Sequence, residues 1–141
     1  MKIELHRKKA PFQFEVHYEH GQELRLDASP DIGGEGFGFR PMETLTAALA
    51  GCSAIDIGLI LQKQKQEVLD FRAELEGERN QDTPAREFKH IRVHYHLWGD
   101  LEAEKVKRAI DLAIEKYCSV ALSLHPGIEL KTDFTIHTKH V

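Results

Sequence analysis

Residues Arg40–Lys65 read RPMETLTAALAGCSAIDIGLILQKQK, and this stretch decides the fold. The proline at its second position suits the first turn of a helix, where its missing N–H is not needed, and it disfavours helical backbone at the residue before it. From Leu45 to Leu61 nearly every residue is apolar or small. The exceptions in that run are Thr46, Ser53 and Asp56. A helix that is apolar all round must be buried all round, so the pattern predicts a central helix that the other elements wrap.

The predicted helix also carries small residues at a spacing that favours close packing. Ala50, Ala54 and Gly58 lie four positions apart, as do Ala47 and Gly51, so each set forms a ridge with almost no side chain. Each glycine costs about 1 kcal/mol relative to alanine, and packing against a second helix offsets that loss. We therefore predict a homodimer in which the central helices of two subunits meet.

Composition limits the class of protein. The 141 residues are 41% hydrophobic and 30% charged, with 19 Lys+Arg against 23 Asp+Glu and a formal net charge of -4. No basic stripe interleaved with aromatic residues is present, which argues against a nucleic-acid partner. The first residues, MKIELHRKK, contain no long apolar segment, so we expect no signal peptide and a cytoplasmic location. We reject a membrane span, because Asp56 interrupts an apolar run shorter than about 18 residues.

The first forty residues alternate between apolar and polar positions and predict a three-stranded meander. The alternation is carried by Ile3 and Leu5, by positions 12–18, and by Leu24 and Leu26. Residues 28–39, ASPDIGGEGFGF, hold four glycines and predict an irregular loop, either a mobile lid or a flexible linker. Neither GxGxxG nor GxxxxGK[ST] is present in this loop, so a nucleotide site is disfavoured.

The rest of the chain completes an α+β pattern. Residues 69–76 and 90–97 alternate as two strands of a hairpin, a second, amphipathic helix spans about Leu101 to Cys118, and residues 119–124 either extend it or form a short further helix. A last strand covers 128–136. The predicted order is βββ-α-ββ-α(α)-β, an antiparallel-rich α+β fold in a single domain over residues 1–141.

Three histidines share one face of the second predicted hairpin strand. His94 and His96 point the same way and are joined on that face by His90, so a metal-binding module is one alternative. No carboxylate or cysteine follows at ligand spacing, and the intervening Arg92 would repel a cation. We therefore favour a solvated face and predict no metal and no cofactor.

The two cysteines carry the chemistry that the sequence suggests. If Cys52 and Cys118 meet, a thiolate can be oxidised to a sulfenic acid, which the second thiol converts to a disulfide. A cation or hydrogen-bond donor must lower the pKa of the reactive thiol, and the candidate cations are Arg7, Arg40 and Arg92. Asp56 lies one helical turn after Cys52, so its charge would raise that pKa unless a cation, the backbone or Ser53 holds it.

Two segments centred on the cysteines resemble a known family. RPMETLTAALAGCSAIDIGLIL and, some sixty residues later, EKYCSVALSL resemble the OsmC/Ohr family of thiol-dependent hydroperoxide reductases, and they are most similar to its YhfA-like branch. The order of strands and helices fits this family over most of the chain. The resemblance implies an intertwined homodimer with the long helices at its centre and active sites at the subunit interface.

The resemblance also implies roles for individual residues. Cys52 would be the peroxidatic and Cys118 the resolving cysteine of a peroxidase that acts in oxidative-stress defence, with organic hydroperoxides as substrates and a dithiol as reductant. In the family pattern Asn-Pro-Glu, the glutamate orients an arginine against the thiolate. Here Arg40 stands at the asparagine position, Met42 follows the proline, and Glu43 comes one place later; Arg7 is the match to the family's arginine. The alternative function is a non-catalytic dimer that binds a small apolar ligand in the same interfacial pocket.

Overall fold

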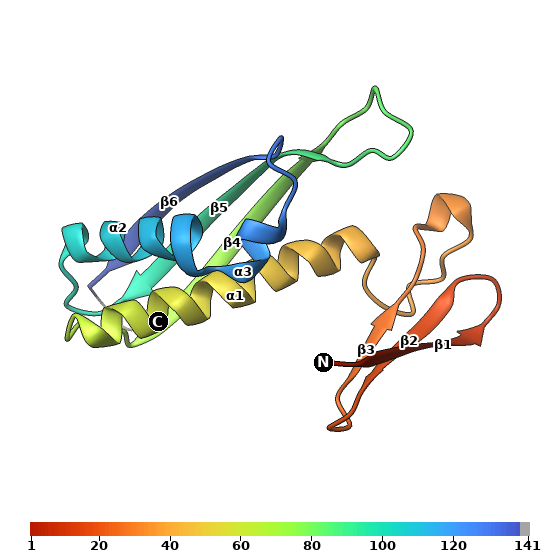
Figure 1. The fold of residues 1–141 in the computed structure, drawn as a ribbon, viewed down its shortest axis with the longest axis horizontal. Coiled ribbons are helices and arrows are strands. Elements are labelled where there is room, and N and C mark those ends of the chain that lie inside the picture. Colours follow the sequence, from red (N-terminus) through yellow and green to blue (C-terminus); the bar gives the residue numbers. More distant parts are fainter. Residues whose placement is uncertain (139–141) are drawn as a thin grey trace. The chain divides into compact units, whose positions relative to one another are not determined.

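A computed structural model describes residues 1–138 of the chain, and their contacts divide it into two compact units, Met1–Leu45 and Thr46–Val141. The order of elements confirms the predicted α+β pattern, with two three-stranded sheets (Figure 1). The prediction that the chain is a single domain stays a prediction.

The N-terminal unit is built on an antiparallel sheet in the order β1-β2-β3. Its strands are β1 (Ile3–Lys9), β2 (Gln13–Tyr18) and β3 (Glu23–Leu26). This is the predicted meander. Val16 is its buried apolar residue, with 6% of its surface exposed.

The glycine-rich loop after β3 is held by specific hydrogen bonds. The Asp27 carboxylate accepts the backbone N–H groups of Ala28, Glu35 and Phe37, and these bonds lower the pKa of Asp27. A Cβ at Gly34 would lie 1.8 Å from the carbonyl oxygen of Ala28, so only glycine permits that approach. The loop contains one 3-10 turn, η1 (Pro30–Ile32), and is more ordered than the lid or linker that the composition predicted.

The C-terminal unit is a mixed sheet with helices on one face (Figure 1). Its strands are β4 (Asp70–Arg79), β5 (Phe88–Trp98) and β6 (Glu129–His137); β4 pairs with β5 antiparallel, and β5 pairs with β6 parallel. The fully buried core lies on the helix side and includes Leu49, Ile57, Leu61, Ile91, Val93, Tyr95, Leu97, Val106 and Ala109.

The long helix α1 (Pro41–Lys63) is buried along one face only. Leu49, Ser53, Ile57 and Leu61 recur every four residues and are the residues of α1 that are buried. By length and composition α1 passes the test for a helix able to cross a membrane, and 22% of its apolar window is buried within the chain. A single helix of this kind does not by itself indicate a membrane span, because the core helix of a globular protein can have the same length and apolar composition.

The second predicted helix is shorter than the sequence indicated. The helix α2 covers Ala103–Leu112 and passes into a π-helical turn, η2 (Ala113–Tyr117). Cys118 then has extended backbone, with φ -67° and ψ 101°, and α3 (Ser119–Ser123) follows. Of the two alternatives for residues 119–124, the break followed by a short helix is the one that occurs, and it places Cys118 at a helix start.

Candidate functional site

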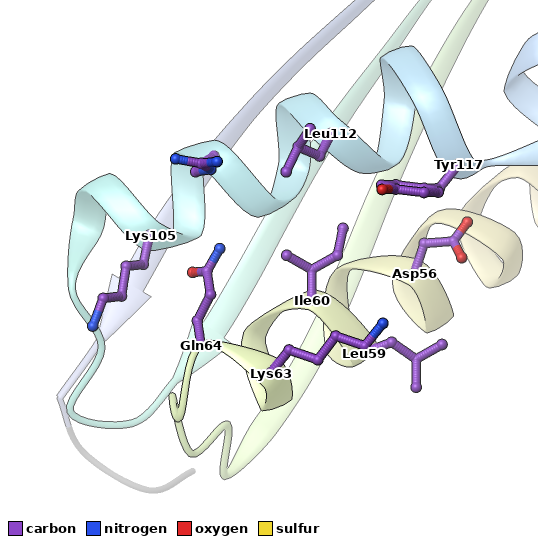
Figure 2. Close-up of a pocket in the computed structure, with 9 residues that line it drawn as sticks. Asp56, Leu59, Ile60, Lys63, Gln64, Lys105, Leu112 and Tyr117 are labelled. Carbon is purple, nitrogen blue, oxygen red and sulfur yellow. The ribbon is translucent and has the colours of Figure 1, made fainter.

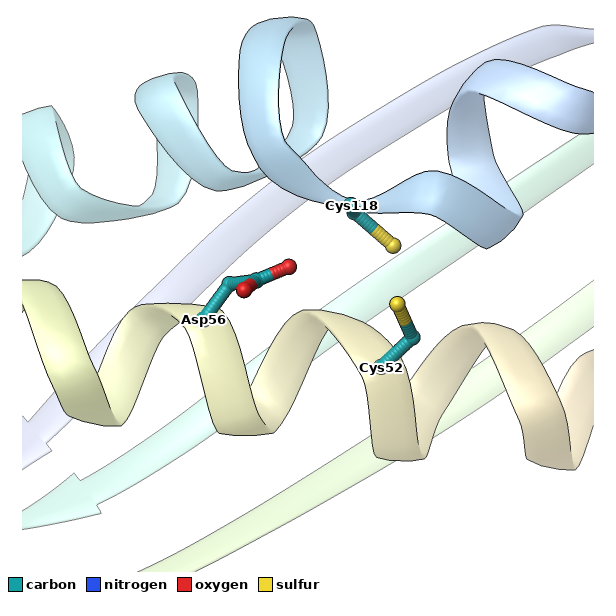
Figure 3. A group of neighbouring side chains, drawn as sticks. All are labelled: Cys52, Asp56 and Cys118. Atoms are coloured by element: carbon teal, nitrogen blue, oxygen red, sulfur yellow. The ribbon is translucent and has the colours of Figure 1, made fainter.

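The fold brings the two cysteines together. Cys52 lies in the middle of α1 and Cys118 just before α3, and Figure 3 shows their sulfurs turned toward one another. The two Sγ atoms and a carboxylate oxygen of Asp56 all lie within 4.8 Å of each other. Both cysteines are free thiols. A disulfide between them therefore requires only a short movement of the two side chains.

Hydrogen-bond donors from the start of α3 surround the Cys52 sulfur. The backbone N–H of Val120 is the largest influence that lowers the pKa of the Cys52 thiol, with smaller contributions from Cys118 and Ser119. Ser119 Oγ lies 3.7 Å from Cys52 Sγ. Burial and the charge of Asp56 oppose these effects, but the pKa still falls below its ordinary value. Cys52 is thus the thiol of the pair that ionises more readily.

Cys118 has the opposite character. It is fully buried, and that burial raises the pKa of its thiol to about 11. Its sulfur caps α3 by accepting the N–H of Ala121 at 3.4 Å. Cys118 is therefore a thiol at neutral pH, beside a cysteine whose pKa is lowered.

Asp56 departs from what the sequence predicted for it. Within residues 1–138 its carboxylate makes neither an ion pair nor a hydrogen bond, whereas a cation, the backbone or Ser53 was expected to hold it. Ser53 is used elsewhere: its hydroxyl donates to the carbonyl oxygen of Ala50 at 3.2 Å and accepts from the Tyr95 hydroxyl at 2.8 Å. Asp56 stays half-buried and points toward the sulfurs (Figure 3).

The three residues expected to form the family's activating network all lie in the N-terminal unit. Arg7 is an exposed residue of β1. Glu43 accepts the backbone N–H of Arg40 at 2.9 Å, and its carboxylate lies 3.9 Å from the Arg40 guanidinium. This is half of a capping box at the start of α1. Their assistance to Cys52 stays a prediction.

The third candidate cation points away from the cysteines. Arg92 lies on the outer face of the C-terminal sheet, where its guanidinium binds the Asp133 carboxylate at 2.7 Å. The neighbouring strand residues Val93 and Tyr95 face the helices and are buried. The alternation of β5 thus puts Arg92 on the far side of the sheet from Cys52.

The rings of His94 and His96 lie 4.5 Å apart, but the three β5 histidines do not gather their ligand atoms at one point. His90 pairs with Glu129 at 2.7 Å, His94 with Asp133 and Thr135, and His96 with His137 at 3.0 Å. In the described part of the chain, the groups of three ligand side chains that gather within 4.8 Å contain none of the histidines of β5. The geometry therefore gives the metal-binding alternative no support.

A groove beside the cysteines runs between α1 and α2. Its volume is about 530 Å³, and its lining is formed by Asp56, Leu59, Ile60, Lys63, Gln64, Lys105, Arg108, Leu112 and Tyr117. Figure 2 shows Ile60 and Leu112 facing each other across it, with Asp56 and Tyr117 toward one end and Lys105 at the other. The groove is thus apolar in the middle, and Asp56 connects it to the sulfurs.

The chain is similar to proteins of a known family. A model of the family described as OsmC-like protein matches residues 33–133, which is more than half of the sequence. The chain belongs to the OsmC-like protein family. It is 44% identical to Protein YhfA of Escherichia coli K12 over 97 residues. These residues cover 68% of this chain and 72% of YhfA.

Solved structures of other proteins share the fold. A hypothetical protein from Aquifex aeolicus has a TM-score of 0.85 and 29% identity, over 99% of this chain and 97% of that one. An organic hydroperoxide resistance protein OsmC from Legionella pneumophila has a TM-score of 0.73 and 20% identity, over 96% and 97% of the two chains. The recognition of the OsmC/Ohr family and its YhfA-like branch from the sequence is therefore confirmed.

Two contributors to the site were missed in the sequence. Val120 acts through its backbone N–H, which leaves no trace in residue type. Ser119 immediately follows Cys118 and offers a hydroxyl to Cys52, and a serine beside the second cysteine was a signal that could have been used.

Proposed function

We propose that this OsmC-like protein is a thiol-dependent peroxidase that reduces organic hydroperoxides. The observation that carries the proposal is the pair of free thiols within 4.8 Å whose pKa values move apart, with that of Cys52 lowered and that of Cys118 raised to about 11. A low-pKa, partly exposed thiol beside a resolving thiol is typical of redox-active cysteines. The family relationship to hydroperoxide resistance proteins supports the same chemistry.

The protein would be oxidised in two steps and then reduced. The Cys52 thiolate attacks one oxygen of the hydroperoxide and the O–O bond breaks, which leaves a sulfenic acid on Cys52 and an alkoxide that takes up a proton to become an alcohol. Cys118 then attacks the Cys52 sulfur, and a disulfide and water form. A dithiol reductant supplies two electrons and two protons to restore both thiols.

The groove between α1 and α2 supports lipophilic substrates. Its middle is lined by apolar side chains such as Ile60 and Leu112, and Asp56 joins it to the sulfurs. An alkyl or aryl group in the groove would bury apolar surface, at roughly 25 cal/mol per Å².

We also propose that the working form is a homodimer, and its support lies on the outward face of α1. Ile55 and Leu59 are 66% and 51% exposed, and a Cβ at Gly51 or Gly58 would meet no atom within 4 Å among residues 1–138, apart from its chain neighbours and the backbone of its own helix. A second copy packed along this face would bury it. Two free cysteines suit a reducing compartment, so we propose that the protein acts in the cytoplasm.

A second candidate function is the binding of a small apolar ligand without catalysis. The observation that favours it is Gln64 Oε1, which lines the groove and is buried without a hydrogen-bond partner in the described residues. A ligand with a donor group would satisfy this oxygen. This alternative requires an inert Cys52.

One experiment separates the two functions. Thiols of the reduced protein are titrated before and after one equivalent of an organic hydroperoxide, in the wild type, Cys52→Ser and Cys118→Ser. The peroxidase predicts rapid loss of two thiols per chain in the wild type, a persistent sulfenic acid in Cys118→Ser and no reaction in Cys52→Ser. Survival of both thiols in excess hydroperoxide would reject the peroxidase and favour ligand binding.

A further inference from the structure

Asp56 is a charged side chain of the thiol site that, together with burial, opposes the oxidation of Cys52. Its negative charge raises the pKa of Cys52, against the donors of α3 that lower it. Its side chain is half-buried, and its carboxylate makes no hydrogen bond or ion pair with any of residues 1–138. The position of the carboxylate is therefore not explained by a bond that stabilises the fold. A carboxylate that works against thiolate formation on Cys52 calls for a role in another step.

The second oxidative step, in which the disulfide forms, lacks an obvious base. Cys118 must lose its proton to attack the Cys52 sulfur, because the thiolate is the nucleophile. Burial raises the pKa of Cys118 to about 11, and its side chain has no access to bulk water. At neutral pH the free thiolate of Cys118 is therefore rare, and a nearby proton acceptor would accelerate the step.

Asp56 is placed to be that acceptor. Its carboxylate oxygen lies within 4.8 Å of the sulfurs of both Cys52 and Cys118, and Figure 3 shows the carboxylate on the same side of α1 as the two sulfurs. No other carboxylate, and no imidazole, joins this group in the described residues. A small side-chain rotation or one bridging water closes the remaining distance, as is common for catalytic contacts in ligand-free sites.

We propose that Asp56 is the proton-transfer residue of the resolving step, an inference that rests on the proposed thiol chemistry. One oxygen of the carboxylate takes the proton of the Cys118 thiol while its sulfur attacks Cys52. The S–O bond of the sulfenic acid breaks, and the departing hydroxide takes the same proton from Asp56 and leaves as water. Cys118 thiol and Cys52 sulfenic acid thus give a disulfide and water, and Asp56 ends as it began.

The test measures the two steps separately in Asp56→Asn. Sulfenic acid formation is followed with a trapping reagent in the Cys118→Ser background, and disulfide formation by rapid quench and mass spectrometry. We expect the first step to be unchanged or faster, because a charge that raises the Cys52 pKa is gone, and the second to slow by about 10²-fold. Asp111→Asn is the matched control, since Asp111 is on α2 and pairs with Lys107.

The pH dependence distinguishes proton transfer from a structural role. In Asp56→Asn the disulfide step should accelerate about tenfold per pH unit toward the raised pKa of Cys118, whereas the wild type should vary less. Asp56→Glu keeps a carboxylate and should recover part of the rate. The titratable and charged groups that face Asp56 or share its groove are Cys52, Lys63, Lys105, Arg108, Tyr117 and Cys118, and all are retained in both variants.

A second oxidant separates this inference from the peroxidase itself. Diamide oxidises the Cys52 thiolate to a sulfenyl-hydrazine adduct, and attack by Cys118 then gives the disulfide and a hydrazine, with the same proton transfer. Slow disulfide formation with diamide in Asp56→Asn would support the role of Asp56 in proton transfer, even if no hydroperoxide reacts with the wild type. Disulfide rates within twofold of the wild type with both oxidants, or a wild type that forms no disulfide with either, would overturn the role of Asp56.

Discussion

Position alone gives two identical side chains opposite properties in this site. Cys52 lies beside the backbone N–H of Val120, which lowers the pKa of its thiol, and Cys118 is buried, which raises the pKa of its thiol. Donors hydrogen-bonded to a thiolate stabilise the charged form, and removal from water destabilises it. The division of labour between the two cysteines thus follows from where each lies relative to α3.

The hydroxyl of Ser119 offers a test of this account. Ser119→Ala removes one donor from the Cys52 thiolate, and a neutral hydrogen bond worth roughly 1 kcal/mol corresponds to about a fivefold loss of thiolate. We expect alkylation of Cys52 by iodoacetamide to slow by about that factor near neutral pH, with the rate profile moved to higher pH. Ser123→Ala, at the exposed end of the same helix, is the control. An unmoved profile in Ser119→Ala would contradict this role.

At the scale of elements, α1 has a buried face that is not wholly apolar. Ser53 is fully buried there and accepts the hydroxyl of Tyr95 from β5 at 2.8 Å, which ties the helix to the sheet directly behind Cys52. Burial raises the pKa of Tyr95 to about 12, so it stays a hydrogen-bond donor. This bond fixes the part of α1 that presents Cys52.

Removal of the Ser53 hydroxyl should destabilise the protein more than removal of the Tyr95 hydroxyl. Ser53→Ala leaves the buried Tyr95 hydroxyl without its acceptor and should lower the free energy of unfolding by about 1–3 kcal/mol. Tyr95→Phe leaves Ser53 still bonded to Ala50 and should cost about 1 kcal/mol. Urea unfolding of both variants and of the double variant checks this; a larger loss in Tyr95→Phe would contradict it.

The cations of the groove lead to a prediction about substrate charge. Lys63 and Arg108 line the groove and make no ion pair with another of residues 1–138. Lys63→Glu with Arg108→Glu should raise KM about tenfold for a hydroperoxide that carries a carboxylate, because a favourable charge contact of roughly 1.4 kcal/mol is lost. KM for a neutral aryl hydroperoxide should not change. Lys89→Glu with Lys131→Glu, two exposed changes on β5 and β6, controls for net charge, and equal effects on both substrates would refute the prediction.

Periodicity was sufficient to predict the elements but not their ends. The alternation on β4 and β5 is complete enough to predict which side chains face the helices, and Val93 and Tyr95 are buried as expected. The break at Cys118 was one of two open alternatives, because the residues on both sides of it have good helix-forming composition. The extended backbone of Cys118 depends on tertiary packing, which moves the cysteine from a helix body to a helix cap.

At the scale of the whole molecule, chain order alone could not predict which residues meet. The sequence marked Cys52 and Cys118 through two motifs, and the fold brings them within 4.8 Å. Asp56 was noticed because it follows Cys52 by one turn, but its lack of a hydrogen-bond or ion-pair partner among residues 1–138 is a property of the three-dimensional arrangement. The donors of the thiolate come from backbone atoms of α3, which residue types do not encode.

The homodimer can be tested on the outward face of α1. Ile55 is 66% exposed in the chain, so Ile55→Glu should leave the subunit core intact while it places a charge in the proposed contact. We expect sedimentation velocity at micromolar concentration to give a dimer for the wild type and a monomer for the variant. Ile32→Glu, the same change at an exposed residue of η1, should remain dimeric. A folded wild-type monomer would reject the homodimer.

The cap that Cys118 provides to α3 has a consequence for the oxidised protein. In the reduced state, the amide of Ala121 donates to the Cys118 sulfur, and the amide of Val120 lowers the pKa of the Cys52 thiol. A disulfide removes the thiolate charge of Cys52, and its formation draws the Cys118 sulfur toward Cys52, so oxidation should weaken the contacts of both amides. We expect faster deuterium uptake in a peptide covering α3 after oxidation, and unchanged uptake in β5; equal uptake in both states would contradict this. A reductant could then recognise the oxidised protein by its loosened backbone, since Cys118 is buried and Cys52 is only partly exposed.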